Sequence, residues 1–490
     1  SVKQAQKDGA TIENISAGLS ISVVKNAIYK VIRASSPEEL GRNIVVQGGT
    51  FYNEAVLRAF EKEMGVEVIR PDIAGLMGAY GAALFGQSKA QSGQTSTLIS
   101  REALEAFHHE TRSEVCGRCG NNCQLTINTF SDGSTYISGN RCDRPITGKA
   151  NTGGRNLYEY KRKLILGYKP VPGKRGKLGI PLCLNMWELL PFWHTFFTKL
   201  GFAVYHSPFS SRDLYLKGQG TIPSDTACFP AKLAHGHIHF LSKLGLDAIF
   251  YPCMPYNFNE GVSDNNYNCP VVAYYPELLA ANVPNLKKVR YLNPYFGLHR
   301  PKDFERKASE WFFNEFQVPK RETVAAAKAA YAAYAAYKED LRATGRAYIE
   351  QARAEDRPIL VVAGRPYHMD PEINHGINDL ITSFGFILIT EDAVAYLEDK
   401  APRHVLNQWT YHARMYNAAR YVCTQEDMEL IQLVSFGCGI DAITGDEMRS
   451  ILEQGGKLYT QLKIDDISNL GAVKIRIRSL MAAIEARKAQ

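Results

Sequence analysis

The sequence predicts an α/β protein with parallel sheets, and two observations carry this prediction. Apolar runs that suit buried strands alternate with helix-length segments twice, once after Lys177 and again after Arg357. Between the two series lies Val324–Glu355, which is rich in strong helix formers and contains no proline. Strands that alternate with helices favour a parallel sheet wound by crossover helices. We therefore expect two parallel α/β domains joined by one long Ala-rich helix.

Length and composition exclude several classes of protein. The chain has 490 residues, enough for two to four domains, with 45% hydrophobic and 22% charged residues, which are ordinary globular values. Its 57 Lys and Arg against 50 Asp and Glu give a net charge of +7, but the basic residues form no long run of the kind that nucleic-acid binding needs. No apolar stretch has membrane-spanning length, and the first ten residues are polar, so we expect a cytoplasmic protein with no membrane partner. Because the chain begins without Met, we expect it to be part of a longer protein.

Residues 1–90 are predicted to form a first domain that contains a strand–turn–helix unit. Its expected elements are a helical run Ile12–Ile32, a strand Asn43–Gln47 and a helix from about Asn53 to Met64. Gly48 and Gly49 lie between this strand and helix, where the backbone can approach a nucleotide closely; a simple tight turn is the alternative. A stretch rich in Gln, Ser and Gly, Gly86–Ser96, marks the end of this domain.

Residues 110–150 are predicted to form a small metal-binding module. Its cysteines follow the spacing C-x2-C-x3-C-x18-C, and they are Cys116, Cys119, Cys123 and Cys142. A predicted hairpin, Gln124–Phe130 and Thr135–Ser138, brings the fourth thiol back to the other three. Four thiolates suit either Zn or a [4Fe-4S] cluster, and the single C-x-x-C favours the cluster. A unit this small usually needs such a site to stay folded.

Residues 175–320 and 357–490 are predicted to be the two α/β domains, with residues 321–356 as the helical linker. The expected strands of the first are LGIPL, FAVYH, AIFYP and PVVAYY, with helices at Leu189–Leu200 and Lys232–Leu244. Those of the second are PILVVAG, FILIT, RYVC and KLYTQLKI, with a helix at Ile377–Phe384.

Three further cysteines border predicted strand ends, where a doubly wound sheet has its ligand crevice. They are Cys228, Cys253 and Cys438, and together they could ligate three irons of a [4Fe-4S] cluster and leave the fourth open. The alternative is that they are buried as small apolar side chains. Cys269 could lie near the same crevice.

A dense polar group follows the strand PILVVAG and contains candidates for catalysis. These residues are His368, Asp370, Glu372 and His375. Carboxylates and imidazoles at the carboxyl end of a strand suit proton transfer, although such residues also cap helices.

The stretch RNIVVQGGTFYNEAVLRAFEKEMGVEVIRPDIAGLMGAYGAAL resembles the C-terminal part of the BadF/BadG/BcrA/BcrD ATPase family, the ATP-driven activators of 2-hydroxyacyl-CoA dehydratases and benzoyl-CoA reductases. The segments KLGIPLCLNMWELLPFWHTFF and SFGCGIDAITGDEMRSILEQGGKLYTQLKI resemble the large fusion proteins that join this activase to a region like 2-hydroxyglutaryl-CoA dehydratase component D. The resemblance implies a partial actin-like ATPase lobe in residues 1–90, followed by two Rossmann-like domains.

The resemblance also implies the site residues. Gly48, Gly49 and Asn53 match the motif on the adenosine side of ATP, and Cys228, Cys253 and Cys438 match in order the thiols that hold a [4Fe-4S] cluster. The phosphate loop of the family and the two cysteines that bridge its activase subunits would lie before Ser1. We therefore expect no ATP hydrolysis by this chain alone.

The resemblance implies part of an ATP-dependent, low-potential electron-transfer system that passes electrons to an acyl-CoA or another small substrate, with self-association or a partner subunit. The alternative function is a non-enzymatic, zinc-stabilised scaffold or electron relay.

Overall fold

The structure is a computed structural model that describes residues 2–32, 37–90, 99–117, 123–140, 144–147, 155–224, 226–400, 406–435, 437–464 and 470–488. It divides into two compact units, Ser1–Ala106 and Phe107–Gln490.

The described part of the first unit is mainly helical. Its elements are α1 (Val2–Lys7), α2 (Ile12–Lys25), a π-helical segment (Asn26–Ile32), α3 (Glu54–Met64), α4 (Met77–Lys89) and α5 (Arg101–Glu105). Its core is a small apolar cluster that includes Val24, Ile28 and Phe60. The strand expected at Asn43–Gln47 is wrong, since only an isolated parallel bridge joins Val45 to Ile69. The pairing ends early because Pro71 has no N–H to donate to a longer ladder.

The second unit begins with a three-stranded antiparallel sheet. Its strands are β1 (His109–Val115), β2 (Gln124–Phe130) and β3 (Thr135–Ser138), in the order β1-β2-β3. The hairpin β2–β3 has the predicted strand bounds, and Ile127 pairs with Ile137 across it. The hairpin is thereby confirmed.

Two parallel four-stranded sheets follow, which confirms the α/β class. The first has the order β5-β4-β6-β8 and comprises β4 (Lys177–Ile180), β5 (Ala203–His206), β6 (Ala248–Phe250) and β8 (Arg290–Leu292). The second has the order β11-β10-β12-β13 and comprises β10 (Ile359–Ala363), β11 (Ile387–Thr390), β12 (Met428–Ser435) and β13 (Thr460–Ile464). Two further strands, β7 (Cys253–Tyr256) and β9 (Tyr295–Gly297), form a separate parallel pair. In the sequence, β7 follows β6 and β9 follows β8 of the first sheet.

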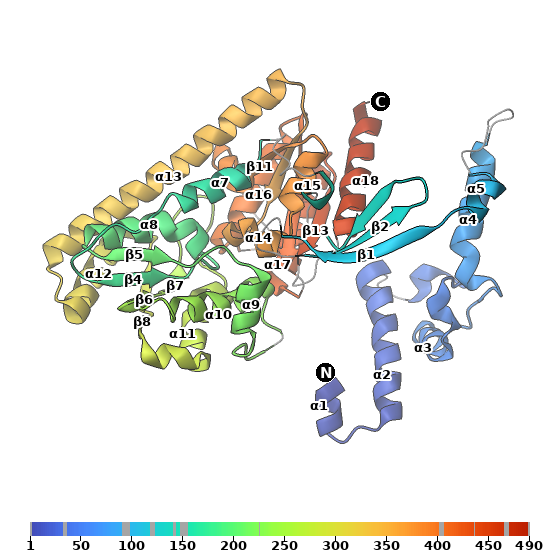
Figure 1. Cartoon of the computed structure of the whole chain (residues 1–490), viewed down its shortest axis with the longest axis horizontal. Coiled ribbons are helices and arrows are strands. Elements are labelled where there is room, and N and C mark those ends of the chain that lie inside the picture. Colours follow the sequence, from blue (N-terminus) through green and yellow to red (C-terminus); the bar gives the residue numbers. More distant parts are fainter. Residues whose placement is uncertain are drawn as a thin grey trace. The chain divides into compact units, whose positions relative to one another are not determined.

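Helices accompany both sheets. They are α7 (Leu157–Leu166), α8 (Met186–Lys199), α9 (Arg212–Gln219), α10 (Phe229–Leu241), α11 (Pro270–Asn282), α12 (Pro301–Phe316), α14 (Pro371–Asn374), α15 (Ile377–Ser383), α16 (Thr410–Cys423), α17 (Gly439–Gln454) and α18 (Leu470–Lys488). The Ala-rich segment is one 35-residue helix, α13 (Lys320–Ala354), drawn in yellow and orange in Figure 1. It packs on α8 of the first α/β half and on β11 of the second.

Two expected strands are helical in the structure. PVVAYY forms the first turns of α11 and RYVC forms the end of α16. A short apolar run fits a buried helix and a buried strand equally well. Pro270 begins α11 at a position where a missing N–H is harmless, which explains the helix there.

The largest apolar core lies on α8 and is strongly aromatic. Trp187, Trp193 and Phe196 are completely buried in it. The ring centroids of Trp193 and Phe250 of β6 lie 4.8 Å apart, which anchors the helix on the first sheet.

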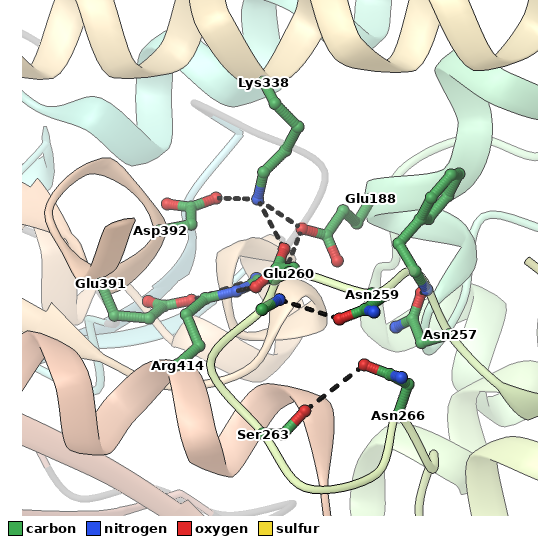
Figure 2. Close-up of polar contacts among 12 residues, drawn as sticks. Glu188, Asn257, Asn259, Glu260, Ser263, Asn266, Lys338, Glu391, Asp392 and Arg414 are labelled. Atoms are coloured by element: carbon green, nitrogen blue, oxygen red, sulfur yellow. Dashed lines mark hydrogen bonds and ion pairs between the residues drawn. The ribbon is translucent and has the colours of Figure 1, made fainter. Parts of the chain in front are cut away.

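A buried ion network joins the two α/β halves to α13 (Figure 2). Lys338 of α13 lies 3.0 Å from the Glu188 carboxylate of α8, 3.4 Å from Glu260 and 3.8 Å from Asp392. Arg414 of α16 lies 2.8 Å from Glu188 and 2.6 Å from Glu260. Buried charges of this kind are tolerated only when they are paired, so the halves must keep this arrangement.

We predict that Glu260→Gln lowers the free energy of unfolding by about 3 kcal/mol at pH 7. Burial alone would raise the pKa of the Glu260 carboxyl, but Arg414 and Lys338 lower it to about 2, against an ordinary value of 4.5. A lowered folded-state pKa stabilises the fold above pH 4.5, and this contribution is lost as the pH falls towards 2. The difference between wild type and variant should therefore shrink across that window in denaturant titrations.

The matched control is Glu350→Gln on the exposed face of α13, which should change the stability by less than about 0.5 kcal/mol. Equal effects of the two substitutions, or a difference independent of pH, would contradict the role of the network.

Candidate functional site

Three cysteines of the second unit occupy the same local position, the N-cap of a helix. Cys228 caps α10, Cys269 caps α11 and Cys438 caps α17. Proline within the first two positions starts both α10 and α11, which places the preceding cysteine at the cap. A backbone N–H of α11 donates to the Cys269 sulfur at 3.4 Å. Helix N-termini carry partial positive charge and lower the free energy of a thiolate.

Arg365 contacts one of these thiols and acts electrostatically on the other two. It follows β10, is 5% exposed, and its Nη1 lies 4.0 Å from the Cys438 sulfur. The same nitrogen donates to the Tyr367 hydroxyl at 3.1 Å, and Nη2 pairs with Asp441 of α17. Burial alone would raise the pKa of Asp441, but Arg365 and His412 lower it well below its usual range, so the pair is ionic.

The thiols also influence one another. Burial raises the pKa of the Cys228 thiol, and it raises that of Cys269 to about 11. A backbone N–H at each thiol and the Arg365 guanidinium act in the opposite direction, and Cys438 raises both values further. Two of these thiols come from the first α/β half, and Cys438 and Arg365 come from the second.

Buried nitrogens around Arg365 have no hydrogen-bond partner among the described residues. They are Arg365 Nε, His368 Nε2 and His412 Nδ1, on side chains that are at most 5% exposed. Unpartnered buried donors are expensive and usually indicate a group that completes them. Three thiols and several N–H donors are the donor set that an anionic iron–sulfur group needs, so the residues fit such a group.

Across the part of the chain that the structure describes, no three or more His, Cys, Asp or Glu side chains converge closely enough to hold a metal ion. The three sulfurs thus do not converge on a single metal-ion position, and what they share is the charge of Arg365.

Cys253 follows the end of β6, and its role as a cluster ligand stays a prediction. It is the first residue of β7 and completely buried. Burial and then Glu277 raise the pKa of its thiol to about 11. Cys228, Cys269 and Cys438 act electrostatically on one another and share Arg365, which supports the expectation that Cys269 lies near the same crevice. The Pro that follows Cys269 is the sequence signal for its place at a helix start.

The polar group after β10 is buried, and most of its described contacts are structural. His368 accepts a hydrogen bond from the Arg365 backbone N–H at 3.1 Å. Asp370 caps α14 and accepts from the Ser210 hydroxyl at 2.6 Å. The ring of His375 stacks on Phe229, 6.1 Å between centroids, and Glu372 is completely buried. His368 adjoins Arg365 of the thiol site, and the catalytic role of all four residues stays a prediction.

The predicted nucleotide residues form a turn and a cap in the first unit. Gly48 has a φ of 100° and donates its N–H to Ala74 O at 2.7 Å. The Asn53 side chain accepts from the Ala55 N–H at 3.0 Å and so caps α3. A Cβ at Gly48 or Gly49 would meet nothing within 4 Å, so the turn is open to another molecule. ATP binding at these residues stays a prediction.

The predicted four-cysteine module is described only in part. Cys116 and Cys123 are buried, and the Cys116 N–H donates to Cys123 O at 2.8 Å. Cys119 and Cys142 lie outside the described residues. The metal content of the module remains a prediction.

Comparison with known proteins divides the chain in the same way. Residues 1–86 match the BadF/BadG/BcrA/BcrD ATPase family. Residues 177–394 match the CoA enzyme activase uncharacterised domain (DUF2229). The chain joins an ATPase-family segment to a CoA enzyme activase domain. This confirms the resemblance seen in the sequence, and the ATPase-family segment contains Gly48 and Asn53, whereas the activase domain contains Cys228, Cys269 and Arg365.

One curated relative of the ATPase-family segment is the 2-hydroxyisocaproyl-CoA dehydratase activator of Clostridioides difficile. It is 39% identical over 87 residues, which are 18% of this chain and 31% of the relative. The chain thus spans about a third of the length of that relative.

Solved structures add no argument about the fold. The C-terminal domain of glucosamine-fructose-6-phosphate aminotransferase from Francisella tularensis is 9% identical, with a TM-score of 0.17 over 68% of this chain and 88% of that one. A hypothetical protein from Thermus thermophilus is 10% identical, with a TM-score of 0.16 over 65% and 80%. Among the helices that the structure describes, none is long and apolar enough to cross a membrane.

We predict that Gly48→Ala destabilises the first unit by about 1–3 kcal/mol, because its φ of 100° and ψ of 155° are accessible almost only to glycine. Gly49→Ala is the matched control, since Gly49 has no positive φ and equal free space. Thermal unfolding of both variants measures the difference. A Gly48→Ala variant as stable as Gly49→Ala would show that the turn relaxes without strain.

Proposed function

We propose that the chain is part of an ATP-dependent electron-transfer activator in which Cys228, Cys269 and Cys438 hold a [4Fe-4S] cluster. The observation that carries the proposal is the placement of three thiols at three helix N-termini around the buried Arg365. The match to an activator of a CoA-ester dehydratase supports a dehydratase partner and a CoA-thioester substrate for the electron.

The electrostatics of the site favour the uptake of negative charge. An iron–sulfur group with thiolate ligands is anionic, and it supplies one-electron transfer when bound. The N-termini of α10, α11 and α17 and the Arg365 guanidinium all stabilise negative charge. Arg365 Nε and His368 Nε2 have no hydrogen-bond partner among the described residues, and in this proposal they donate hydrogen bonds to it. Asp441 holds Arg365 in place through their buried ion pair.

The ATPase-family segment supplies the energy in this proposal. Nucleotide would bind at the open turn of Gly48 and Gly49, and its hydrolysis needs a phosphate loop that is not among the motifs of this sequence. A further subunit or segment would provide that loop.

The second candidate is a non-enzymatic, zinc-stabilised scaffold or electron relay. The buried, hydrogen-bonded pair Cys116 and Cys123 at the base of the β-sheet favours a metal in that module. Iron, acid-labile sulfide and zinc contents of anaerobically purified protein separate the candidates. One zinc and no iron would leave only the scaffold.

We predict that Cys228→Ala, Cys269→Ala and Cys438→Ala each remove the iron, sulfide and visible absorption of one cluster, because each deletes a ligand. Cys253→Ala is the matched control and should keep the full content, since Cys253 lies within β7. The measurement is metal and sulfide analysis with the absorption spectrum. If Cys253→Ala lost the iron and sulfide of the cluster and Cys269→Ala kept them, the ligands would be Cys228, Cys253 and Cys438, as the sequence predicted.

We also predict that Arg365→Gln lowers the reduction potential of the cluster by roughly 100 mV, because a buried charge near the site no longer favours the extra electron. Arg365→Lys keeps the charge and should shift the potential much less. Spectroscopic redox titration measures both, with thermal unfolding as a check on folding. Equal potentials in wild type and Arg365→Gln would rule out this electrostatic role.

A further inference from the structure

A second concave site lies outside the thiol site, at the carboxyl ends of β7 and β9. It is a half-open cavity of about 460 Å³ between these strands, the loop after β7 and the first turns of α12. That volume lies within the usual range for small-molecule sites. The carboxyl ends of parallel strands are also where ligands of α/β proteins commonly bind.

Three basic side chains line this cavity: His299, Arg300 and Lys307. Burial lowers the pKa of His299, and the charges of Arg300 and Lys307 lower it further, against an opposing effect of Asp303. These charged side chains therefore act on the imidazole within one cavity. Among the described residues, neither Arg300 nor Lys307 has an ion pair within 4.0 Å. The cavity therefore holds two cations that are free to meet an anion.

The two carboxylates that line the cavity are already matched by cations. Asp264 lies 2.5 Å from Lys400, and Asp303 lies 3.7 Å from Arg306. The charge that remains for a ligand is positive, which favours phosphate groups over a metal ion or a neutral sugar.

One wall of the cavity is a planar aromatic surface. The Tyr256 ring stacks on the His299 ring, 4.4 Å between centroids and 24° between planes. Gly297 permits this stack, because a Cβ there would lie 3.1 Å from His299 Nδ1 and 3.2 Å from Tyr256 Cβ. His299 Nδ1 is buried and has no hydrogen-bond partner among the described residues. Such a wall suits a planar ring by stacking.

We propose that this cavity binds a small molecule that combines phosphate groups with a planar ring, of the chemical class of a nucleoside diphosphate. Arg300 and Lys307 bind the phosphates, and Tyr256 with His299 faces the ring. Asn259 and Asn266 of the loop after β7 line the cavity. The same loop carries Glu260 into the buried ion network (Figure 2). No cysteine lines this cavity, so the test of ligand binding here is independent of the proposed cluster.

The test is titration calorimetry of the full chain with inorganic pyrophosphate and with ADP at fixed ionic strength. We expect the double variant Arg300→Gln/Lys307→Gln to bind pyrophosphate about tenfold more weakly or worse. The matched control is Lys287→Gln/Lys288→Gln, which removes two exposed charges from a short helical segment outside the cavity and should bind as wild type does. We expect ADP to bind more tightly than pyrophosphate, and Tyr256→Leu to remove that advantage.

Absence of pyrophosphate binding, or equal weakening in the two double variants, would overturn the site. ADP binding that survives in Arg300→Gln/Lys307→Gln would place that nucleotide in the ATPase-family segment and count against this cavity. An ADP affinity no higher than that of pyrophosphate would overturn the assignment of a planar ring.

Discussion

The buried ion network around Lys338 and Arg414 is the constraint on which the rest of the second unit depends. It contains three cations and four carboxyl groups, which are Lys161, Lys338, Arg414, Glu188, Glu260, Glu391 and Asp392. Burial and the charge of Asp392 raise the pKa of Glu391 to about 7, so this carboxyl is the one that takes up a proton near neutral pH and brings the network close to charge balance. Loss of one of these charges while the rest stays buried would leave its partner uncompensated, which costs about 3–5 kcal/mol. The network therefore fixes how the halves face each other.

The geometry of the thiol site depends on how the two α/β halves face each other. Cys228 and Cys269 begin helices of the first half, whereas Arg365 and Cys438 belong to the second, so the site exists only while the halves keep their relation. The three cysteines themselves are half-buried, whereas the Arg365 side chain beside them is buried. The ionic pair of Arg365 with Asp441 keeps the cation in place without a contribution from solvent.

The sequence was sufficient for the α/β class, the long helix and the hairpin, because each has a strong local signal. Repeated strand–helix alternation, an Ala-rich segment without proline and a turn at Ser131–Gly133 need no tertiary information. The helix α11 and the end of α16 were predicted as strands, because apolar runs that are buried on all sides lose their periodicity. The convergence of Arg365 with three distant thiols depends on tertiary packing, and no spacing in the chain encodes it.

The loop Asn257–Asn268 connects these features physically. Glu260 enters the ion network, and Asp264 accepts the backbone N–H of Asn407 in the second half at 2.9 Å. The loop then returns through Tyr267, whose hydroxyl meets that of Tyr256 at 3.2 Å, and ends beside Cys269. One segment thus touches the charged junction, the basic cavity and a thiol of the proposed cluster site. Polar contacts hold the loop at both ends. A shift of the loop at the cavity would therefore also move Cys269, which follows Asn268 directly in the chain. Disruption of the ion network would in the same way displace both the cavity and the thiol.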